Sequence, residues 1–583
     1  MLLTMASTFS KWTHFTFPVI LLSIAILFLI ANYLLFTINY ARQLQDEFQN
    51  ITTYFETLSD REWFDVVPQD INDEKIKTGS TKIDRVGEEV YMRAKENENT
   101  VTHVKSVKNP VWYEVVAREF KDETFNIGFV NMDQAAGDVQ TKAKRVKVNF
   151  DRVAGDVRWS DLAPERIDEN STCPNIPMPR FEDYRDLDVV VASVARCEDG
   201  HESKDVYRLQ VNLVVANLLV RSGRKENQPV YAVFVGSCNP MWEIFRCDDL
   251  LWNEGNNWVY KPELTRIHKL VLMPIGPCQF VPPFTPFGDQ DLWRKLNHTT
   301  TRTNHHHHHR PKEAYVTVLH TSEDYVCGAI VLAQSIIQSN TTKDLILLFD
   351  DNISPRSLEA LRAAGWQTRR IRRIRSPYSK ENTYNEWNYS KLLIWKLTRY
   401  EKLLFIDADL IVNKNLDKFF VYPQLTAAGN YQKHFFNSGL MLVEPSRCAF
   451  ETLKEKMKVV ESYNGGDQGF LNEMFAWWHR LPPQMNYLKV FVDVNDHLHW
   501  INKDVFAVHY TGLKPWRCDD KERDCNWDVL EFHRYASNSA HRMWWKVFKS
   551  MREDLRGYCS LYRGKNDSLS PNEGYIPLVN KGL

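Results

Sequence analysis

The stretch LLFIDADLIV, Leu403–Val412, holds eight apolar residues and two carboxylates, Asp407 and Asp409. Its branched aliphatic residues predict a strand buried on both faces of a sheet. Side chains two residues apart on a strand point the same way, so both carboxylates are expected on one face. At about 5 Å apart and an effective dielectric of about 20, they would repel by roughly 3 kcal/mol. A divalent cation between them would offset this repulsion; a solvated strand end, where Asp409 starts a turn, is the alternative.

The segments around this stretch alternate between strand and helix patterns. Strands are expected at Ala314–Tyr325, Asp344–Asp351 and Gln367–Pro377. A helix is expected after each of them, at Gly328–Gln338, at Ser354–Gly365 and around Lys391–Arg399. This order predicts one mostly parallel, doubly wound α/β domain over residues 314–550. Ligands of such sheets bind beyond the carboxyl ends of the strands, where Asp407 and Asp409 stand.

A second, smaller α/β domain is expected over residues 187–296. Leu187–Ala195, Pro229–Ser237 and His268–Gly276 have the composition of strands, and Val206–Ser222 has apolar residues at helical spacing. We find no chemical motif in this segment, so an accessory packing or recognition role is the default. Residues 297–313 contain five consecutive histidines, His305–His309, and read as a polar linker; adventitious metal binding is the alternative.

The N-terminal region carries a candidate membrane anchor. Phe17–Ile38 contains 22 residues without a charge, and a helix of this length spans about 33 Å, enough for a bilayer core. A cleaved signal peptide is the alternative, but its apolar core is usually about 7–15 residues long. We therefore expect a cytosolic tail at residues 1–16, a signal anchor at 17–38 and a partly folded stem at 39–186. Residues 551–583 are expected to form a C-terminal tail.

The composition gives no sign of a nucleic-acid partner, because the charges of 73 basic and 74 acidic residues nearly cancel. The cysteines favour an oxidising lumen. Ten cysteines without a CxxC zinc pattern are compatible with disulfides, and Cys518 and Cys525 are close enough in sequence to close a loop. Aromatic residues make up 13% of the chain, which leans toward carbohydrate handling. Asn-x-Ser/Thr sequons follow the anchor at Asn50, Asn170, Asn297, Asn340, Asn352, Asn388 and Asn566.

Three further segments supply polar groups for a metal or phosphate site. In Phe435–Ser446, an Asn-Ser-Gly triplet precedes a strand and allows close backbone approach to a ligand. In Asn464–Phe475, two glycines precede Asp467 and Gln468 at a helix start; Asp467 can also be the N-cap of this helix, and the two roles are compatible. In His509–Trp516, His509 is a candidate third metal ligand, although a histidine at such a strand end is more often structural. Lys514 can neutralise a phosphate.

The motifs DAD, NSG, NGGDQGF and HYTGLKPW, in this order, resemble those of glycosyltransferase family 8, the glycogenin-like enzymes. The anchor, the smaller α/β domain and the segments NYSKLLIWKLTRYEKLLFIDADLIV and GGDQGFLNEMF are most similar to the plant glucuronosyltransferases that substitute xylan in the Golgi. The resemblance covers about Ala314–Trp545 and extends to about Leu187. It implies a GT-A, Rossmann-like domain that uses a UDP-sugar and Mn²⁺ in the Golgi lumen, on a single-pass type II membrane protein.

The resemblance also implies roles for particular residues. The metal ligands would be Asp407, Asp409 and His509. The catalytic residues would be Lys391, Asp467 and Gln468. The residues that bind the donor would be Thr321, Tyr325, Lys391, Asp407, Ala408, Asp409, Asn437, Ser438, Gly439, Asn464, Gly465, Gly466, Asp467, Gln468, His509, Tyr510, Thr511, Gly512, Leu513 and Lys514.

Family members retain the anomeric configuration, which leaves two mechanisms open. Double displacement needs a carboxylate nucleophile, for which Asp467 is the candidate, with Gln468 beside it. In front-face attack, which we favour, the acceptor hydroxyl attacks directly and the departing phosphate is the base.

The resemblance implies UDP-glucuronate as donor and xylan or a xylo-oligosaccharide as acceptor. Five arginines fall within Arg369–Arg375, and one of them is a candidate partner for the C6 carboxylate of glucuronate. An exposed basic strand edge is the alternative for this segment. Rival functions are a glycogenin-type glucosyltransferase that primes its own glucan and a catalytically silent lectin-like scaffold. A complex with other Golgi glycosyltransferases is a further expected partnership.

Overall fold

The structure is a computed structural model, and the chain divides into two compact units, Met1–His103 and Val104–Leu583. All described residues belong to the second unit: 109–121, 124–132, 144–165, 167, 171–193, 204–221, 229–284, 290–296, 312–430, 434–489, 501–517 and 537–560. The candidate anchor, the five histidines and the pair Cys518 and Cys525 lie outside these ranges. Within them, none of the helices has both the length and the apolar character to cross a membrane.

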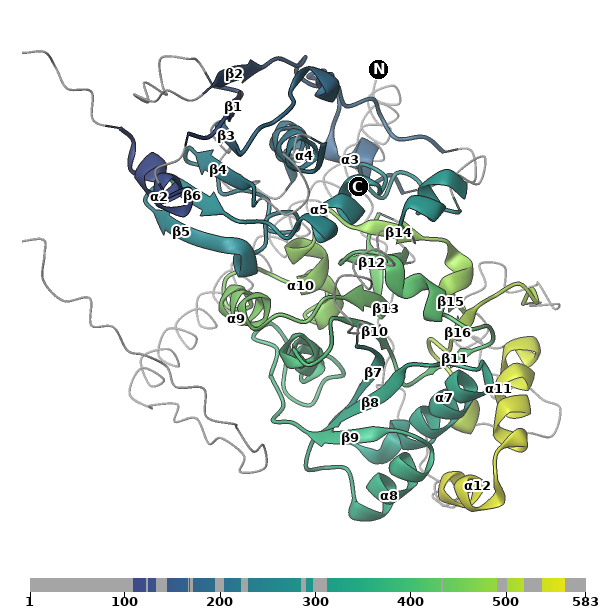
Figure 1. The fold of residues 1–583 in the computed structure, drawn as a ribbon. Helices are drawn as coiled ribbons and strands as arrows, with labels where there is room; N and C mark the ends of the chain where they lie inside the picture. Colours follow the sequence, from purple (N-terminus) through teal and green to yellow (C-terminus); the bar gives the residue numbers. More distant parts are fainter. Residues whose placement is uncertain are drawn as a thin grey trace, which may run out of the picture. The chain divides into compact units, whose positions relative to one another are not determined.

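Seven strands form the central sheet of the C-terminal domain, in the order β14-β12-β13-β10-β7-β8-β9 (Figure 1). They are β7 (Glu313–Leu319), β8 (Asp344–Phe349), β9 (Gln367–Arg370), β10 (Lys402–Ile406), β12 (Thr426–Gly429), β13 (Phe436–Val443) and β14 (His479–Leu481). Neighbouring strands are parallel except where β13 meets β10 and β12, so the sheet is mixed. The sequence predicted the parallel strands β7 to β10 but not the reversal at β13.

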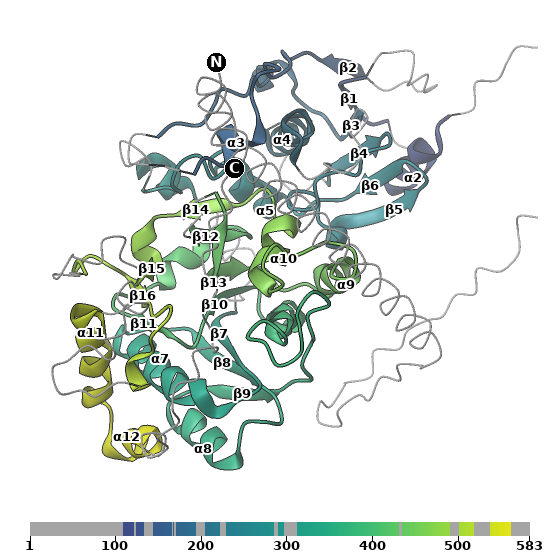
Figure 2. The ribbon, with the colours of Figure 1, turned by 180° about the vertical axis from the view of Figure 1, so that it is seen from behind.

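Helices cover both faces of this sheet (Figures 1 and 2). In β10, Leu404 and Ile406 belong to the core under α7, whereas Leu403 and Phe405 belong to the opposite core. On the first face lie α7 (Val326–Gln338), α8 (Pro355–Ala363), α11 (Asn538–Ser550) and α12 (Glu553–Ser560). On the second lie α9 (Arg447–Lys456), α10 (Asp467–Met474) and the 3-10 helix η6 (Asn388–Lys396).

The stretch Leu403–Val412 is not one strand, which corrects the expectation from its composition. β10 ends at Ile406, residues 407–409 form a turn, and β11 (Leu410–Val412) begins directly after it. β11 belongs to a separate sheet with β16 (Ala507–His509) and β15 (Tyr487–Leu488). The turn between two sheets, rather than the alternation along one strand, therefore sets where the two aspartates point.

The antiparallel strand β13 brings a second segment to this turn. Leu440 of β13 pairs with Ile406, so the residues that precede Leu440 extend beyond the end of β10. There Asp407 N donates to Gly439 O at 2.9 Å. A parallel neighbour would place its carboxyl end here; the antiparallel strand instead places the Asn-Ser-Gly triplet beside Asp407.

The N-terminal domain contains a six-stranded sheet in the order β2-β1-β3-β4-β6-β5. Its strands are β1 (Ile127–Val130), β2 (Arg145–Val148), β3 (Val189–Ser193), β4 (Tyr231–Val235), β5 (Leu250–Glu254) and β6 (Asn257–Tyr260). One face packs on α4 (Val206–Arg221), and the other packs on α2 (Val111–Glu119). Because β1 and β2 are in this sheet, it draws on residues that the sequence assigned to the stem.

The expected strand at His268–Gly276 is wrong. Its first residues end the helix α5 (Leu264–Val271). The Glu263 side chain caps this helix by accepting from Thr265 N at 2.8 Å and Arg266 N at 2.7 Å. The local cap therefore overrides the strand composition of the run that follows it.

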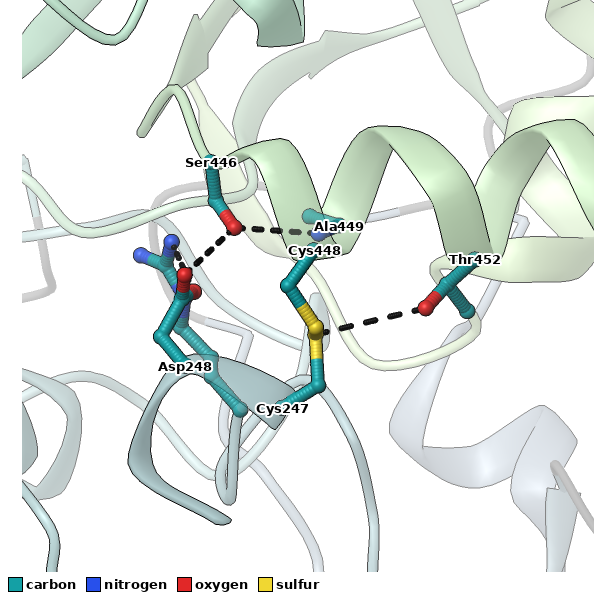
Figure 3. Close-up of a disulfide and its surroundings, with 7 residues drawn as sticks. Cys247, Asp248, Ser446, Cys448, Ala449 and Thr452 are labelled. Atoms are coloured by element: carbon teal, nitrogen blue, oxygen red, sulfur yellow. Dashed lines mark hydrogen bonds and ion pairs between the residues drawn. A yellow bond between two sulfur atoms is a disulfide. The ribbon is translucent and has the colours of Figure 1, made fainter. Parts of the chain in front are cut away.

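A disulfide and hydrogen bonds join the two domains (Figure 3). Cys247, in the 3-10 helix η4 (Cys247–Asp249), is bonded to Cys448 of α9. Beside it, Ser446 Oγ donates to Asp248 Oδ1 at 2.7 Å. These contacts tie the edge of the N-terminal domain to the start of α9.

A buried ion network lies at the same junction. Arg246 Nη1 is 2.8 Å from Glu444 Oε2, and Lys402 Nζ is 3.4 Å from Glu444 Oε1. Glu444 is only 8% exposed. Burial alone would raise the pKa of Glu444, but Lys402 and Arg246 outweigh burial and lower it to about 2. Glu444 therefore stabilises the junction as a carboxylate.

Two further disulfides, each joining two described cysteines, lie within the domains. Cys173 is bonded to Cys278 in the N-terminal domain, and Cys327 of α7 is bonded to Cys559 of α12. Because α12 packs on α7 and α8, residues through Ser560 belong to the C-terminal domain. Part of the segment that the sequence assigned to a C-terminal tail is thus folded.

We predict that Glu444→Gln lowers the free energy of unfolding at neutral pH by about 3 kcal/mol, because Arg246 and Lys402 lose their buried anion. The folded-state pKa of Glu444 is depressed from 4.5 to about 2, so its contribution is present above pH 4.5 and is lost as pH falls toward about 2. Urea unfolding across this pH range should show the difference from wild type shrinking. The exposed Glu359→Gln is the control, and a difference independent of pH would contradict the prediction.

Candidate active site

Asp407, Asp409 and His509 converge at the end of β10. One ligand atom from each lies within 4.8 Å of the others. His509 Nε2 is 3.3 Å from Asp409 Oδ1, and the pairing of β11 with β16 sets His509 opposite Leu410. Two carboxylates and one imidazole form a mixed donor set that suits Mn²⁺. The three ligands proposed from the sequence therefore fit a divalent ion in type and spacing.

Neighbouring charges affect the two carboxylates differently. Burial raises the pKa of Asp407; Lys391, with its Nζ 3.4 Å from Asp407 Oδ1, opposes this rise, and the charge of Asp409 adds to it. For Asp409, burial is outweighed by Lys514 and His509, which hold the pKa well below the usual carboxyl range. Lys514 Nζ lies 2.6 Å from Asp409 Oδ2. Asp409 is thus held in its ionised form. The repulsion between the two carboxylates that the sequence predicted contributes to the raised pKa of Asp407.

A chain of amides orients the imidazole of His509. Asn486 Oδ1 lies 3.2 Å from His509 Nδ1, and Asn486 Nδ2 donates to Asn437 Oδ1 at 2.9 Å. A proton on Nδ1 would be donated to Asn486 Oδ1, which would leave Nε2, the nitrogen that faces Asp409, to bind a metal. A Cβ at Gly439 would overlap the His509 ring, which explains why the triplet ends in glycine. The sequence did not signal Asn486, because it lies outside every motif.

Asp407, Asp409 and His509 form what we call the metal trio, and Lys391 connects Asp407 of this trio to Asp467. Its Nζ lies 2.7 Å from Asp467 Oδ2 and donates to Ser438 Oγ at 3.1 Å. Ser438 Oγ in turn donates to Asp467 Oδ2 at 2.8 Å. Gln468 Oε1 accepts from Asn437 Nδ2 and Ser438 N, each at 3.2 Å. The structure therefore brings all the residues proposed as catalytic into one hydrogen-bonded group.

The turn before α10 has a structural role that the sequence assigned differently. Gly466, not Asp467, is the N-cap residue of α10. Asn464 Oδ1 accepts from Gly466 N at 3.0 Å and Gly469 N at 3.1 Å, so Asn464 closes the turn. Gly465 has φ of +69°. Asp467 is consequently the first helical residue, and its carboxylate is left to bind Lys391.

The loop after β16 places its backbone and Lys514 at the site, but not the Tyr510 side chain. Tyr510 is buried, and its hydroxyl donates to Ala540 O of α11 at 2.7 Å. Lys489 Nζ donates to Leu513 O at 3.1 Å and lies 3.0 Å from His541 Nε2, so buried groups beneath the loop support it. Thr511 and Gly512 form the intervening turn, with φ of +70° at Gly512. Neither Lys489 nor His541 had a sequence signal.

The loop after β7 carries the two residues expected to hold the nucleoside. Tyr325 ends the 3-10 helix η5 (Glu323–Tyr325), and Lys514 Nζ lies 5.5 Å from its ring centroid. Thr321 Oγ1 lies 2.8 Å from His320 Nδ1. Burial lowers the pKa of His320 to about 4, so this imidazole is neutral at physiological pH. The structure adds His320 to the groups at this edge.

One of the five arginines, Arg373, is linked to the loop after β7. Arg370 and Arg375 form ion pairs with other carboxylates. Arg373 Nε lies 3.2 Å from Asp350 Oδ2, and Asp350 Oδ2 also accepts from Thr321 N at 3.0 Å. Asp350 therefore links Arg373 to Thr321, a predicted donor-binding residue.

The N-terminal domain contacts the far end of α10. Trp242 Nε1 donates to Met474 O at 2.7 Å, and its ring centroid lies 4.6 Å from that of Phe475. Lys204 Nζ lies 3.0 Å from Glu473 Oε2. α10 has only eight residues. Its first residue is thus at the site while its last turn is bound by the other domain.

We predict that Asp409→Asn weakens Mn²⁺ binding by about 100-fold or more, since losing even an outer-shell partner commonly costs about 10- to 100-fold. Titration calorimetry of the full chain with MnCl₂ would measure this. Asp504→Asn is the matched control, because the Asp504 side chain is 79% exposed and pairs with Lys414. Equal Mn²⁺ affinity in the two variants would contradict the metal site.

Two family models match the chain. "Glycosyl transferase family 8" matches residues 316–520, and "GUX1-5 N-terminal domain" matches residues 98–278. The second range includes residues that the sequence assigned to the stem. Together they cover the two folded domains described above.

Relatives of known sequence match across both domains. An Arabidopsis thaliana protein provisionally named UDP-glucuronate:xylan alpha-glucuronosyltransferase 4 is 52% identical over 72% of this chain and 76% of its own. UDP-glucuronate:xylan alpha-glucuronosyltransferase 2 from the same plant is 46% identical over 73% of each chain. Among solved structures, the galactosyltransferase LgtC covers 42% of this chain and 99% of its own, at 18% identity and a TM-score of 0.30. The chain belongs to glycosyltransferase family 8 and is a glycosyltransferase with a GUX1-5 N-terminal domain.

Proposed function

We propose that the enzyme transfers glucuronic acid from UDP-glucuronate to xylan, with retention of configuration and with Mn²⁺, in the Golgi lumen. The relatives named for this reaction support the choice of donor and acceptor. The uncharged segment Phe17–Ile38, as a signal anchor, would hold the enzyme at the Golgi membrane.

The observation that carries the proposal is that each of the two aspartates in the metal trio is paired with its own lysine. Lys514 binds Asp409, and Lys391 binds Asp407. Asp407, Asp409 and His509 would hold the divalent ion, which when bound neutralises charge on the diphosphate. Lys514 would bind a phosphate oxygen as a point charge. A cation site beside two ammonium groups suits a nucleoside diphosphate leaving group.

The contacts of Asp467 favour front-face attack over double displacement. Asp467 Oδ2 accepts from Lys391 and Ser438, and the residue is 5% exposed. The Lys391 ammonium and the Ser438 hydroxyl stabilise the negative charge of this carboxylate, which makes it a weaker nucleophile. In front-face attack the acceptor oxygen bonds to the anomeric carbon, the bond from that carbon to the phosphate oxygen breaks, and the hydroxyl proton passes to the departing phosphate. Lys391, Ser438 and Asp467 would then orient the sugar.

A donor screen tests the proposed function. With xylo-oligosaccharides as acceptors, we expect UDP-glucuronate to be used at least about 100-fold better in kcat/KM than UDP-glucose or UDP-galacturonate, because buried polar groups reject a mismatched substrate strongly. Product analysis by mass spectrometry would identify the transferred sugar. Transfer of glucose at a comparable rate, or self-labelling without acceptor, would favour the glycogenin-type alternative.

We expect Arg373→Ala to lower kcat/KM for UDP-glucuronate about ten-fold or more, with a smaller effect on residual UDP-glucose turnover. The reason is that Arg373 is proposed to bind the C6 carboxylate, which glucose lacks. Arg370→Ala is the control, because the Arg370 side chain is 71% exposed and pairs with Asp351. Equal losses for both donors would show that Arg373 supports the loop through Asp350 instead.

A further inference from the structure

Exposed aromatic side chains gather at the edge of the site. Among the described residues, Tyr463 and Tyr378 are 47% and 37% exposed. They lie on the two segments that meet at the turn before α10. With Phe435, which is partly buried against Tyr463, they form what we call the aromatic rim. Single exposed apolar residues need no explanation, but a cluster beside a site does.

One side of the aromatic rim is joined directly to the catalytic group. Tyr463 OH accepts from Gln468 Nε2 at 2.9 Å. The Tyr463 ring stacks on Phe435, with centroids 4.9 Å apart and planes at 13°. Gln468 also binds Ser438 N. The Tyr463 ring is therefore held at a set angle, and one side chain separates it from Ser438, which is proposed to contact the donor sugar.

The other side of the aromatic rim is held against the same turn. Ser376 Oγ donates to Gly465 O at 2.6 Å, and Asn385 Nδ2 donates to Asn464 O at 2.7 Å. These two bonds hold both ends of the segment that carries Tyr378. The exposed ring is thus attached to a supported loop.

We propose that the aromatic rim binds the acceptor polysaccharide, an uncharged chain of pyranose units; this rests on the function proposed above. Of the charged groups of the site, Lys391 and Asp467 are buried and Lys514 is partly buried, and these groups match a charged donor. The aromatic rim instead offers aromatic faces with hydroxyl tips, which suit the apolar C–H faces and the hydroxyl groups of a sugar. A xylose unit has no exocyclic carbon, so its ring packs flat against such a face. The exposed rings would thus bind the acceptor, and the charged groups beside them would bind the donor.

Tyr463→Ala tests the proposal. We expect this change to raise the KM for xylohexaose about five-fold or more, by loss of stacking, and to leave the affinity for UDP with Mn²⁺ unchanged. Tyr463→Phe, which keeps the ring, should retain a KM near that of wild type. Val459→Ala is the matched control, because Val459 is 72% exposed and lies on the same α9–α10 segment. If Tyr463→Ala does not fold, Tyr378→Ala provides the same comparison from the other side of the aromatic rim.

Two outcomes would overturn the proposal, and they are distinguishable. If wild type uses xylohexaose and both Tyr463→Ala and Tyr378→Ala keep its KM within two-fold, the aromatic rim is not the acceptor site although the proposed function stands. If wild type itself neither binds xylohexaose nor transfers to it, the acceptor assignment fails together with the proposed function. A rise in KM for xylohexaose with equal loss of UDP affinity would also overturn it, because the change would then act through Gln468 on the donor site.

Discussion

The charge balance around the end of β10 is the constraint on which the rest of the site depends. Three buried or half-buried carboxylates, Asp407, Asp409 and Asp467, face two ammonium groups, Lys391 and Lys514. Removing either lysine would leave a buried carboxylate without its partner, which is costly. With both lysines in place, the carboxylates outnumber the ammonium groups by one, and His509 supplies a nitrogen atom beside them. The protein alone therefore attracts a cation, and the proposed diphosphate donor would bind together with that cation.

This balance requires segments distant in sequence to end at one point, and the sheet topology provides this. β10 supplies Asp407, the return strand β13 supplies the Asn-Ser-Gly triplet, and β16 of the small sheet supplies His509. Because β13 is antiparallel to β10, its first residues rather than its last lie at the site. Backbone bonds such as Asp407 N to Gly439 O keep these segments in register.

The sequence predicted those parts of the structure that depend on local chemistry. The capped helix α8, with Ser354 at its N-cap, and the parallel strands of the C-terminal domain follow from periodicity and capping. The approach of Asp407, Asp409 and His509 to one another followed from the motifs. The break of Leu403–Val412 between two sheets was indicated only by the alternative in which Asp409 starts a turn, because the composition of this stretch suits one long strand equally well. Asn486 and Lys489 act through contacts with residues distant in the sequence, which no local pattern encodes.

The contribution of the N-terminal domain follows from the shortness of α10. A helix rises about 1.5 Å per residue, so eight residues span about 12 Å. Trp242 and Lys204 bind one end of this helix, and Lys391 binds Asp467 at the other. A displacement of the last turn is passed along such a rigid element to its first residue. Since about 1 Å of misplacement at a reaction centre can cost about 100-fold in rate, the position of Asp467 depends on both domains. The disulfide between Cys247 and Cys448 keeps the two domains joined where this dependence arises.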